Sequence, residues 1–365
     1  MAAPYLKEFG KKALIVTGKI ITKTGLADEV QKVLKEQGID SAVFNDLPGE
    51  PTDLMIYAGV DVYKKEGCDF IIGLGGGTPL DSAKAIAAMA VLPGKLIDYF
   101  GKEMKGDFAP LVLIPTTAGT GSEVTKYVVY TDTATDAKLL IKGEALLPKI
   151  AVIDYTYTMS SPVSVTTNTG MDALTHAIES YTCRKATPVT DLYCIDAVKR
   201  IFKWLPVAVK DGTNKEAREN MALASYEAGV AINTSPTTIV HGMSRPIGAL
   251  FHVPHGISNA MLLVECLKAV MEGCYERFAR LGVEIGFSDY ASSLFYVGEC
   301  GTDGYAALEA VVEYLIQNRI IDHYTADEEL VSEYPDDYVE VNGYYFDNSN
   351  IVIHQLVGNH GERRH

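Results

Sequence analysis

The sequence predicts an α/β protein over about the first 160 residues, followed by an all-helical region. Continuous apolar runs alternate with segments of helical periodicity, a pattern typical of parallel strands in a doubly wound sheet. Two of these runs lead directly into glycine-rich turns. Strand-like runs then fade, and from about residue 167 to 282 nearly every segment has helical spacing.

The expected strands are short runs of apolar residues: ALIVTG (13–18), SAVFND (41–46), DFIIGL (69–74), PLVLIPT (110–116) and IAVID (150–154). Helical patterns separate the first four of them, at 26–38, 52–66 and 81–92. Residues 127–141 have a polar centre between two strand-like stretches, which indicates a β-hairpin. After a boundary loop at 160–162, the strongest helical patterns lie at 171–182, 190–203 and 216–232.

Composition indicates a folded protein whose main activity is not nucleic-acid binding. Of 365 residues, 47% are hydrophobic and 22% are charged, so the chain can bury a sizeable core. A net charge of −15 argues against binding a phosphate backbone. The acidity is uneven, because residues 321–365 hold ten Asp and Glu against two Arg. No pattern predicts the fold of this acidic segment.

No stretch has the features of a secretion signal, and no apolar run is long enough to span a bilayer. The six cysteines are scattered without a C-x-x-C pair, as is typical of reduced thiols. These features predict a soluble cytoplasmic protein with neither a nucleic-acid nor a membrane partner.

The first glycine-rich turn is GGGTPLDSAK (75–84), between a predicted buried strand and a helix. Glycines allow the backbone to approach an anion, and the free N–H groups of a helix start can bind phosphate. The turn matches neither the P-loop nor G-x-G-x-x-G, so pyrophosphate binding and a plain tight turn both stay open.

The second turn, PTTAGTGSEVT (115–125), also follows a predicted buried strand. It offers hydroxyls and two glycines at the carboxyl end of a parallel strand, where α/β proteins bind ligands. The alternative is a capping loop in which Thr120 and Glu123 form a capping box. Two such turns on successive strands favour a nucleotide-binding cleft.

Four side chains of metal-ligand type lie in the helical region: Asp172, His176, His241 and His255. Asp172 and His176 are four residues apart, so on a helix they share one face and can bind one ion. Three imidazoles and one carboxylate suit Zn²⁺ or Fe²⁺ better than Mg²⁺ or Ca²⁺. Against this, a single buried histidine is more often a hydrogen-bonded core residue. His252 could share the site, support it or form a local cap.

Four motifs together resemble the iron-dependent, or group III, alcohol dehydrogenase family: GGGTPLDSAK, PTTAGTGSEVT, TGMDALTHAIESY and VHGMSRPIGALFHVPHGISNAM. They occur in the family's order, and the resemblance runs from about Gly10 to Leu263. It implies a dehydroquinate synthase-like architecture with three expected parts. These are an α/β dinucleotide-binding domain (1–160), a helical metal-binding catalytic domain (161–320) and a divergent acidic segment of unknown fold (321–365).

The resemblance also implies roles for individual residues. The implied metal ligands are Asp172, His176, His241 and His255. His252 is a further catalytic candidate, and the implied cofactor is NAD or NADP. The implied cofactor-binding residues are Gly18, Gly75, Gly76, Gly77, Thr78, Asp81, Thr116, Thr117, Thr120, Ser122, Thr125 and Lys138.

What the resemblance implies is a metal-dependent oxidoreductase that transfers a hydride between a small alcohol or diol and NAD(P), or reduces the corresponding aldehyde. Fe²⁺, or Zn²⁺ in its place, would lower the pKa of the alcohol, whose carbon would then pass a hydride to the nicotinamide. Dimers are usual in the family, so a homodimer is expected.

The chain departs from the family at two positions and at both ends. Gly18 stands where many members have an aspartate that holds the adenosine ribose, so NAD and NADP both stay open. Arg245 stands where many members have a histidine that could relay a proton. The altered termini motivate one alternative, a non-catalytic or impaired homologue that still binds cofactor and metal. The related dehydroquinate synthases are a weaker alternative, because the motifs follow the alcohol dehydrogenase pattern.

Overall fold

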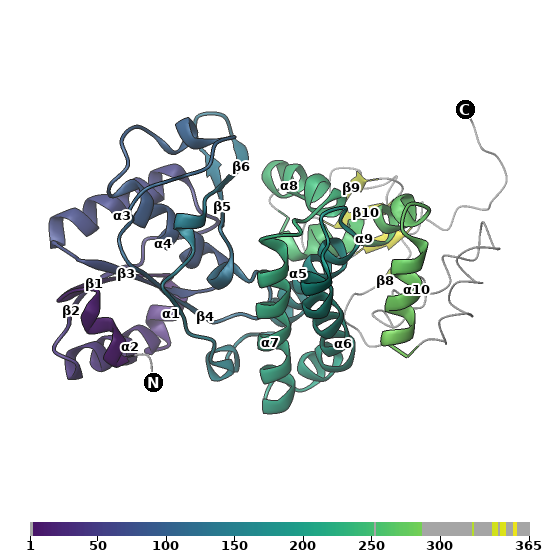
Figure 1. The fold of residues 1–365 in the computed structure, drawn as a ribbon, viewed down its shortest axis with the longest axis horizontal. Helices are drawn as coiled ribbons and strands as arrows, with labels where there is room; N and C mark the ends of the chain where they lie inside the picture. The colour runs from purple at the N-terminus through teal and green to yellow at the C-terminus, as the bar shows by residue number, and fades with distance from the viewer. Residues whose placement is uncertain are drawn as a thin grey trace. The chain divides into compact units, whose positions relative to one another are not determined.

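The structure, a computed structural model, describes residues 3–251 and 253–286 and four short strands between residues 323 and 355. It divides into two compact units, Met1–Gly304 and Tyr305–His365. In the first unit a parallel sheet with flanking helices precedes a helical region (Figure 1), which confirms the predicted fold class. His252 lies outside the described residues.

A five-stranded parallel sheet forms the centre of the N-terminal part, in the order β2-β1-β3-β4-β7. Its strands are β1 Lys12–Thr17, β2 Asp40–Phe44, β3 Phe70–Gly75, β4 Leu111–Pro115 and β7 Ile150–Ala151. Each coincides with a predicted apolar run, although β7 is only two residues long. The order reverses between β1 and β3, and doubly wound sheets bind ligands at the carboxyl ends of strands beside such a switch point.

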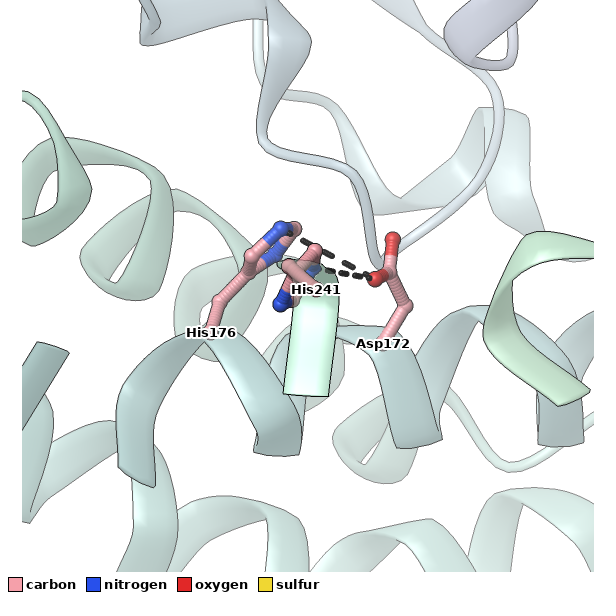
Figure 2. Close-up of side chains that lie close together, drawn as sticks. All are labelled: Asp172, His176 and His241. Carbon is pink, nitrogen blue, oxygen red and sulfur yellow. Dashed lines mark ion pairs between the residues drawn. The ribbon is translucent and has the colours of Figure 1, made fainter. Parts of the chain in front are cut away.

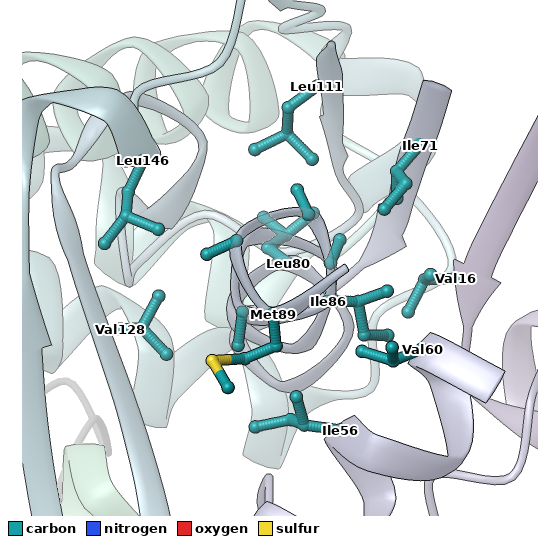
Figure 3. Close-up of a cluster of buried hydrophobic side chains, with 14 of the residues drawn as sticks. Val16, Ile56, Val60, Ile71, Leu80, Ile86, Met89, Leu111, Val128 and Leu146 are labelled. Atoms are coloured by element: carbon teal, nitrogen blue, oxygen red, sulfur yellow. The ribbon is translucent and has the colours of Figure 1, made fainter. Parts of the chain in front are cut away.

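Both faces of the sheet are buried, which explains why the strands are apolar throughout. On β1, Leu14 and Val16 join one buried cluster, while Ala13 and Ile15 join another. The first cluster contains side chains of α3 (Asp53–Glu66) and α4 (Gly77–Met89), as Figure 3 shows. The second contains side chains of α2 (Leu26–Glu36). Helices on the two sides therefore bury alternate residues of the same strand.

The remaining elements of the N-terminal part are short. Helix α1 (Lys19–Lys23) follows β1 directly. Strands β5 (Tyr127–Asp132) and β6 (Ala137–Lys142) form the predicted antiparallel hairpin. Helix α4 begins four residues earlier than predicted, because the first glycine-rich turn itself forms the first helical turn. Pro79 is tolerated in that turn, since its first N–H groups have no intrahelical acceptor.

Helix α5 (Val163–Thr182) is the central helix of the helical region and packs against α6 (Pro188–Lys210), α7 (Lys215–Ile232) and α9 (His255–Met271). The other helices here are α8 (Ile239–Phe251) and α10 (Tyr275–Glu284). Helix α5 begins eight residues before the predicted start. In this added stretch the hydroxyls of Thr166, Thr167 and Thr169 donate to carbonyls four residues back. These bonds satisfy the three hydroxyls on the backbone of the helix itself.

The second unit contains a four-stranded sheet in the order β8-β11-β10-β9. Its strands are β8 His323–Tyr324, β9 Tyr338–Val341, β10 Tyr344–Asp347 and β11 Ile353–Gln355. The pairs β9–β10 and β10–β11 are antiparallel, and β8–β11 is parallel. The sequence predicted no strands here, although aromatic and β-branched residues make up most of β9 and β10.

Among the described residues, no helix combines the length and the apolar character needed to cross a membrane. The cysteines that the structure describes, at positions 68, 183, 194, 266 and 274, are all free thiols.

Glu227 of α7 makes the stability of the protein depend on pH. The residue is 8% exposed, and burial together with nearby Asp196 raises its pKa from 4.5 to about 8. The folded state therefore holds a proton that the unfolded state releases, so stability falls as the pH rises from about 4.5 to 8. We predict that Glu227→Gln is about 1–2 kcal/mol more stable than the wild type at pH 8.5 but not at pH 5. Thermal melting at both pH values tests this, and parallel pH profiles of the two proteins would contradict it.

Candidate active site

Two of the predicted metal ligands lie on one face of α5. Asp172 and His176 are one helical turn apart, and both are buried, at 3% and 6% exposure. The Nε2 atom of His176 lies 3.7 Å from Oδ1 of Asp172 (Figure 2). The spacing of four residues therefore places the two side chains next to each other on one face of the helix, as the sequence predicted.

Helices α8 and α9 bring the other two predicted ligands to the same carboxylate oxygen. The Nε2 atom of His241 lies 3.4 Å from Oδ1 of Asp172, and that of His255 lies 3.7 Å from it. The rings of His176 and His241 are stacked, with centroids 4.6 Å apart. Ligand atoms of Asp172, His176 and His241 all lie within 4.8 Å of one another. The structure thus brings all three histidines to Asp172, and Asp172, His176 and His241 form the tightest group.

These distances fit a divalent metal ion. Ligands at 2.0–2.2 Å from a tetrahedral ion lie about 3.4 Å from one another, and the imidazole nitrogens lie 3.4–3.7 Å from the Asp172 oxygen. The donor set fits as well, because several electron-pair donors held together away from water need a cation or protons between them. The amide of Asn259 supplies part of this compensation. Its Nδ2 atom lies 2.8 Å from Asp172 Oδ1 and 3.2 Å from His241 Nε2.

The electrostatics of the cluster favour the metal-ligating forms of Asp172, His176 and His255, but favour protonation of His241. Burial opposes ionisation of Asp172, but the surrounding histidines outweigh it and hold its pKa below the ordinary value. Burial lowers the pKa of both His176 and His255, which favours neutral imidazoles. At His241 burial acts in the same direction, but contacts with Asp172 and Glu179 outweigh it and raise the pKa.

A glycine allows α9 to approach α5 closely enough to place His255. A Cβ atom on Gly256 would lie 1.9 Å from the carbonyl oxygen of Asn168 on α5. No side chain fits between a backbone and a carbonyl at that separation. Gly256 therefore sets the distance between the two helices, and the neighbouring His255 reaches Asp172 because of it.

The two glycine-rich turns lie at the carboxyl ends of β3 and β4, as predicted. Gly18 follows β1, so it lies at the carboxyl edge of the sheet beside the switch point. A cavity of about 730 Å³ lies between these turns and the histidine cluster. The predicted residues that line it are Gly77, Thr78, Asp81, Thr120, Ser122, Thr125, Lys138, Asp172, His176, His241 and His255. The predicted residues that do not line it are Gly18, Gly75, Gly76, Thr116 and Thr117.

Several predicted cofactor residues bind one another. Asp81 accepts hydrogen bonds from Ser122 Oγ at 2.5 Å and from the N–H of Val129 at 2.8 Å. Lys84, for which no sequence pattern predicted a role, is completely buried and donates to Thr125 Oγ1 at 3.1 Å. Burial lowers the pKa of this lysine. These contacts join the first turn to the second turn and to the start of β5.

The second turn does not form the capping box considered above. Thr120 Oγ1 accepts from the N–H of Ser122 at 3.2 Å, and a short 3-10 turn, η3 (Ser122–Val124), follows. Gly121 has φ 59°, in the left-handed region, and a Cβ there would lie 2.7 Å from Cα of Gly229 on α7. The turn therefore packs directly on the helical region, where a larger residue would not fit.

Within the described part of the chain, the cavity wall carries five basic side chains, Lys126, Lys138, Lys142, Lys185 and Arg245, of which Lys138 and Arg245 were noted in the sequence. Lys138 of β6 forms an ion pair with Glu50 at 2.8 Å. Arg245 lies one helical turn after His241 on α8 and lines the same cavity. Burial lowers the pKa of its guanidinium.

Comparison with known proteins identifies the family. Residues 1–155 match the family model "Iron-containing alcohol dehydrogenase", and residues 166–342 match "Fe-containing alcohol dehydrogenase family, C-terminal". The NAD-dependent methanol dehydrogenase of Bacillus methanolicus is 42% identical over 283 residues, covering 77% of this chain and 74% of that protein. The chain belongs to the iron-containing alcohol dehydrogenase family.

Other members of the iron-containing alcohol dehydrogenase family are also similar to the chain. The 1,3-propanediol dehydrogenase of Citrobacter freundii is 39% identical over 304 residues, covering 82% of this chain and 79% of that protein. A crystal structure of 1,3-propanediol oxidoreductase matches with a TM-score of 0.82 and 35% identity, covering 88% of this chain and 83% of that one. The predicted family is thus confirmed. The C-terminal family match continues past residue 321, where no motif resemblance was found.

The close contact at Gly256 gives a test of the helix packing in this iron-containing alcohol dehydrogenase. We predict that Gly256→Ala pushes α9 away from α5, moves His255 and weakens metal binding about tenfold or more. Gly242→Ala is the matched control, because Gly242 directly follows His241 and a Cβ there meets nothing within 4 Å. Metal titration of both apoproteins measures the effect. Equal affinities in the two variants would contradict the role of Gly256.

Proposed function

We propose that the protein transfers a hydride between a small alcohol or diol and NAD(P), or reduces the corresponding aldehyde, at a divalent ion held by Asp172, His176, His241 and His255. One observation carries this proposal. Three imidazole nitrogens lie 3.4–3.7 Å from one buried carboxylate oxygen, in the wall of a cavity that the glycine-rich turns also line. This arrangement supports a metal-bound substrate beside a nucleotide.

The proposed chemistry divides between the ion and the chain. A bound Fe²⁺ or Zn²⁺ supplies a Lewis acid that lowers the pKa of an alcohol or polarises a carbonyl. The chain holds the ligands in place and supplies two walls that orient substrate and cofactor toward each other. Gly77 and Thr78, in the first turn of α4, present N–H groups suited to a pyrophosphate. Thr120, together with Thr116 and Thr117 outside the cavity lining, is proposed to contact the ribose and nicotinamide side, and Lys138 is proposed to lie near the cofactor.

Relatives support the substrate class and the cofactor. The relatives named above are a methanol dehydrogenase described as NAD-dependent and a 1,3-propanediol dehydrogenase. These names favour small unbranched alcohols or diols and NAD. NADP stays part of the proposal because Gly18 provides no carboxylate to repel a 2′-phosphate.

We also propose a domain boundary, a cellular location and an oligomeric state. Division into domains near residue 160 is supported by the family matches, which end at 155 and resume at 166. A cytoplasmic homodimer without a membrane partner is proposed from the sequence and the family. The dehydrogenase names of the relatives favour a catalytic protein over the alternative of a non-catalytic homologue.

Chelation tests the proposed function directly. Metal-loaded protein should form NADH or NADPH when given methanol, 1-propanol or 1,3-propanediol, because the ion activates the alcohol. Treatment with a chelator should abolish this activity, and Fe²⁺ or Zn²⁺ should restore it. Absorbance at the reduced-nicotinamide band measures the rate. Absence of turnover with every alcohol and both cofactors, in protein shown to contain metal, would overturn the proposal.

Gly18 gives a second test, of cofactor choice. Its backbone is extended, with φ −98° and ψ 158°, and a Cβ there meets nothing within 4 Å, so aspartate fits. We predict that Gly18→Asp raises the preference for NAD over NADP about tenfold, because the carboxylate repels the 2′-phosphate. Gly18→Asn is the uncharged control of the same shape. The kcat/KM ratio for the two cofactors measures the change, and an equal shift in both variants would exclude charge as its cause.

A further inference from the structure

Glu179 is a completely buried carboxylate on α5, at 0% exposure. No sequence pattern predicted a role for it. It lies one turn beyond His176 and two turns beyond Asp172, so one face of α5 carries all three residues. A buried carboxylate needs donors that compensate for lost hydration. The hydrogen-bond donors around Glu179 therefore indicate which part of the structure this carboxylate holds in place.

Among the described residues, the donors to the Glu179 carboxylate come from the segment 238–241, at the start of α8. Oε1 accepts from Thr238 Oγ1 and from the N–H of Val240, both at 2.7 Å. Oε2 contacts Nδ1 of His241 at 2.5 Å and the N–H of the same residue at 3.4 Å. One carboxylate thus contacts both the ring and the backbone of a proposed metal ligand.

The two nitrogens of His241 have different partners, which decides where its proton lies. Nε2 faces the amide Nδ2 of Asn259 at 3.2 Å, and an amide nitrogen can only donate. Nε2 is therefore the acceptor, and Nδ1 carries the hydrogen that Glu179 accepts. This tautomer directs the Nε2 lone pair toward Asp172 Oδ1, 3.4 Å away. By contrast, the Nδ1 atom of His255 is buried without a hydrogen-bond partner among the described residues.

We infer that Glu179 is a positioning residue, which fixes the tautomer and orientation of His241 for metal binding. The inference rests on the ligand set of the proposed function. A carboxylate that accepts the second N–H of a ligating histidine fixes its ring and makes it a stronger donor to the metal. Because Glu179 also binds N–H groups in the first turn of α8, it holds both the ring and the backbone of His241 against α5.

Glu179→Gln tests this inference, because glutamine keeps the shape but cannot accept every bond. Its oxygen can face either the His241 ring or the Val240 N–H, and its NH₂ group then opposes the other donor. We expect the Kd of the apoprotein for Zn²⁺, measured by competition with a chromophoric chelator, to rise about 10–100-fold. The visible spectrum of the Co²⁺-loaded variant should also differ from that of the wild type. Glu227→Gln, the same change at a buried glutamate of α7 that pairs with Arg200 instead of a proposed metal ligand, should alter neither.

Thr238→Val tests whether Glu179 acts by orienting the His241 ring or only by accepting hydrogen bonds at the start of α8. It removes one hydrogen bond to Glu179 and leaves the His241 contact in place. We expect its Zn²⁺ Kd to stay within about threefold of the wild type. A loss as large as that of Glu179→Gln would show that Glu179 acts by holding the helix, and would overturn the inference.

Other outcomes separate this inference from the proposed function. Wild-type Zn²⁺ affinity in folded Glu179→Gln overturns the inference alone, and so does an equal loss in Glu227→Gln. Failure of the wild type to bind Zn²⁺, Fe²⁺ or Co²⁺ overturns the proposed ligand set itself. If Glu179→Gln does not fold, long-range ¹H–¹⁵N NMR of the wild-type apoprotein decides. The spectrum is recorded at a pH high enough for His241 to carry a single proton. The Nδ1–H tautomer at His241 is expected there, and Nε2–H would overturn the inference.

Discussion

The buried carboxylate of Asp172 is the point on which the arrangement of the helical region depends. Burying a charge is unfavourable unless other groups surround and compensate it. Here the compensating groups, His176, His241, His255 and Asn259, come from three helices, α5, α8 and α9. These helices must therefore converge on one oxygen atom, and a site able to hold an ion follows from that convergence.

Close backbone contacts make this convergence possible. Gly256 lets α9 approach α5, and Gly121 lets the second glycine-rich turn approach α7 at Gly229. The first contact brings His255 into the cluster, and the second holds the carboxyl edge of the sheet against the helical region. The positions of the histidine cluster and of the second glycine-rich turn thus both depend on glycines, because a Cβ atom there would collide with the backbone of a neighbouring helix.

Polar side chains near the cavity serve two different purposes. Asp81, Ser122 and Lys84 are occupied by hydrogen bonds between the turns and β5, so they hold the cavity wall in shape. Glu179 likewise lies behind His241 rather than in the cavity wall. A preorganised site needs such supporting contacts, because a ligand that is free to rotate binds a metal or a substrate less tightly.

The sequence by itself determined the features that repeat over short distances. Continuous apolar runs predicted the parallel strands, because both faces of the sheet are buried, and the spacing of four residues placed Asp172 and His176 on one helix face. Motifs also marked His241 and His255 as candidates, but only the tertiary structure brought them to Asp172. Glu179 and Lys84 escaped prediction, since their partners lie 41 to 62 residues away in the chain. Local periodicity reports which face of an element is buried, whereas packing between helices and turns decides which residues meet there.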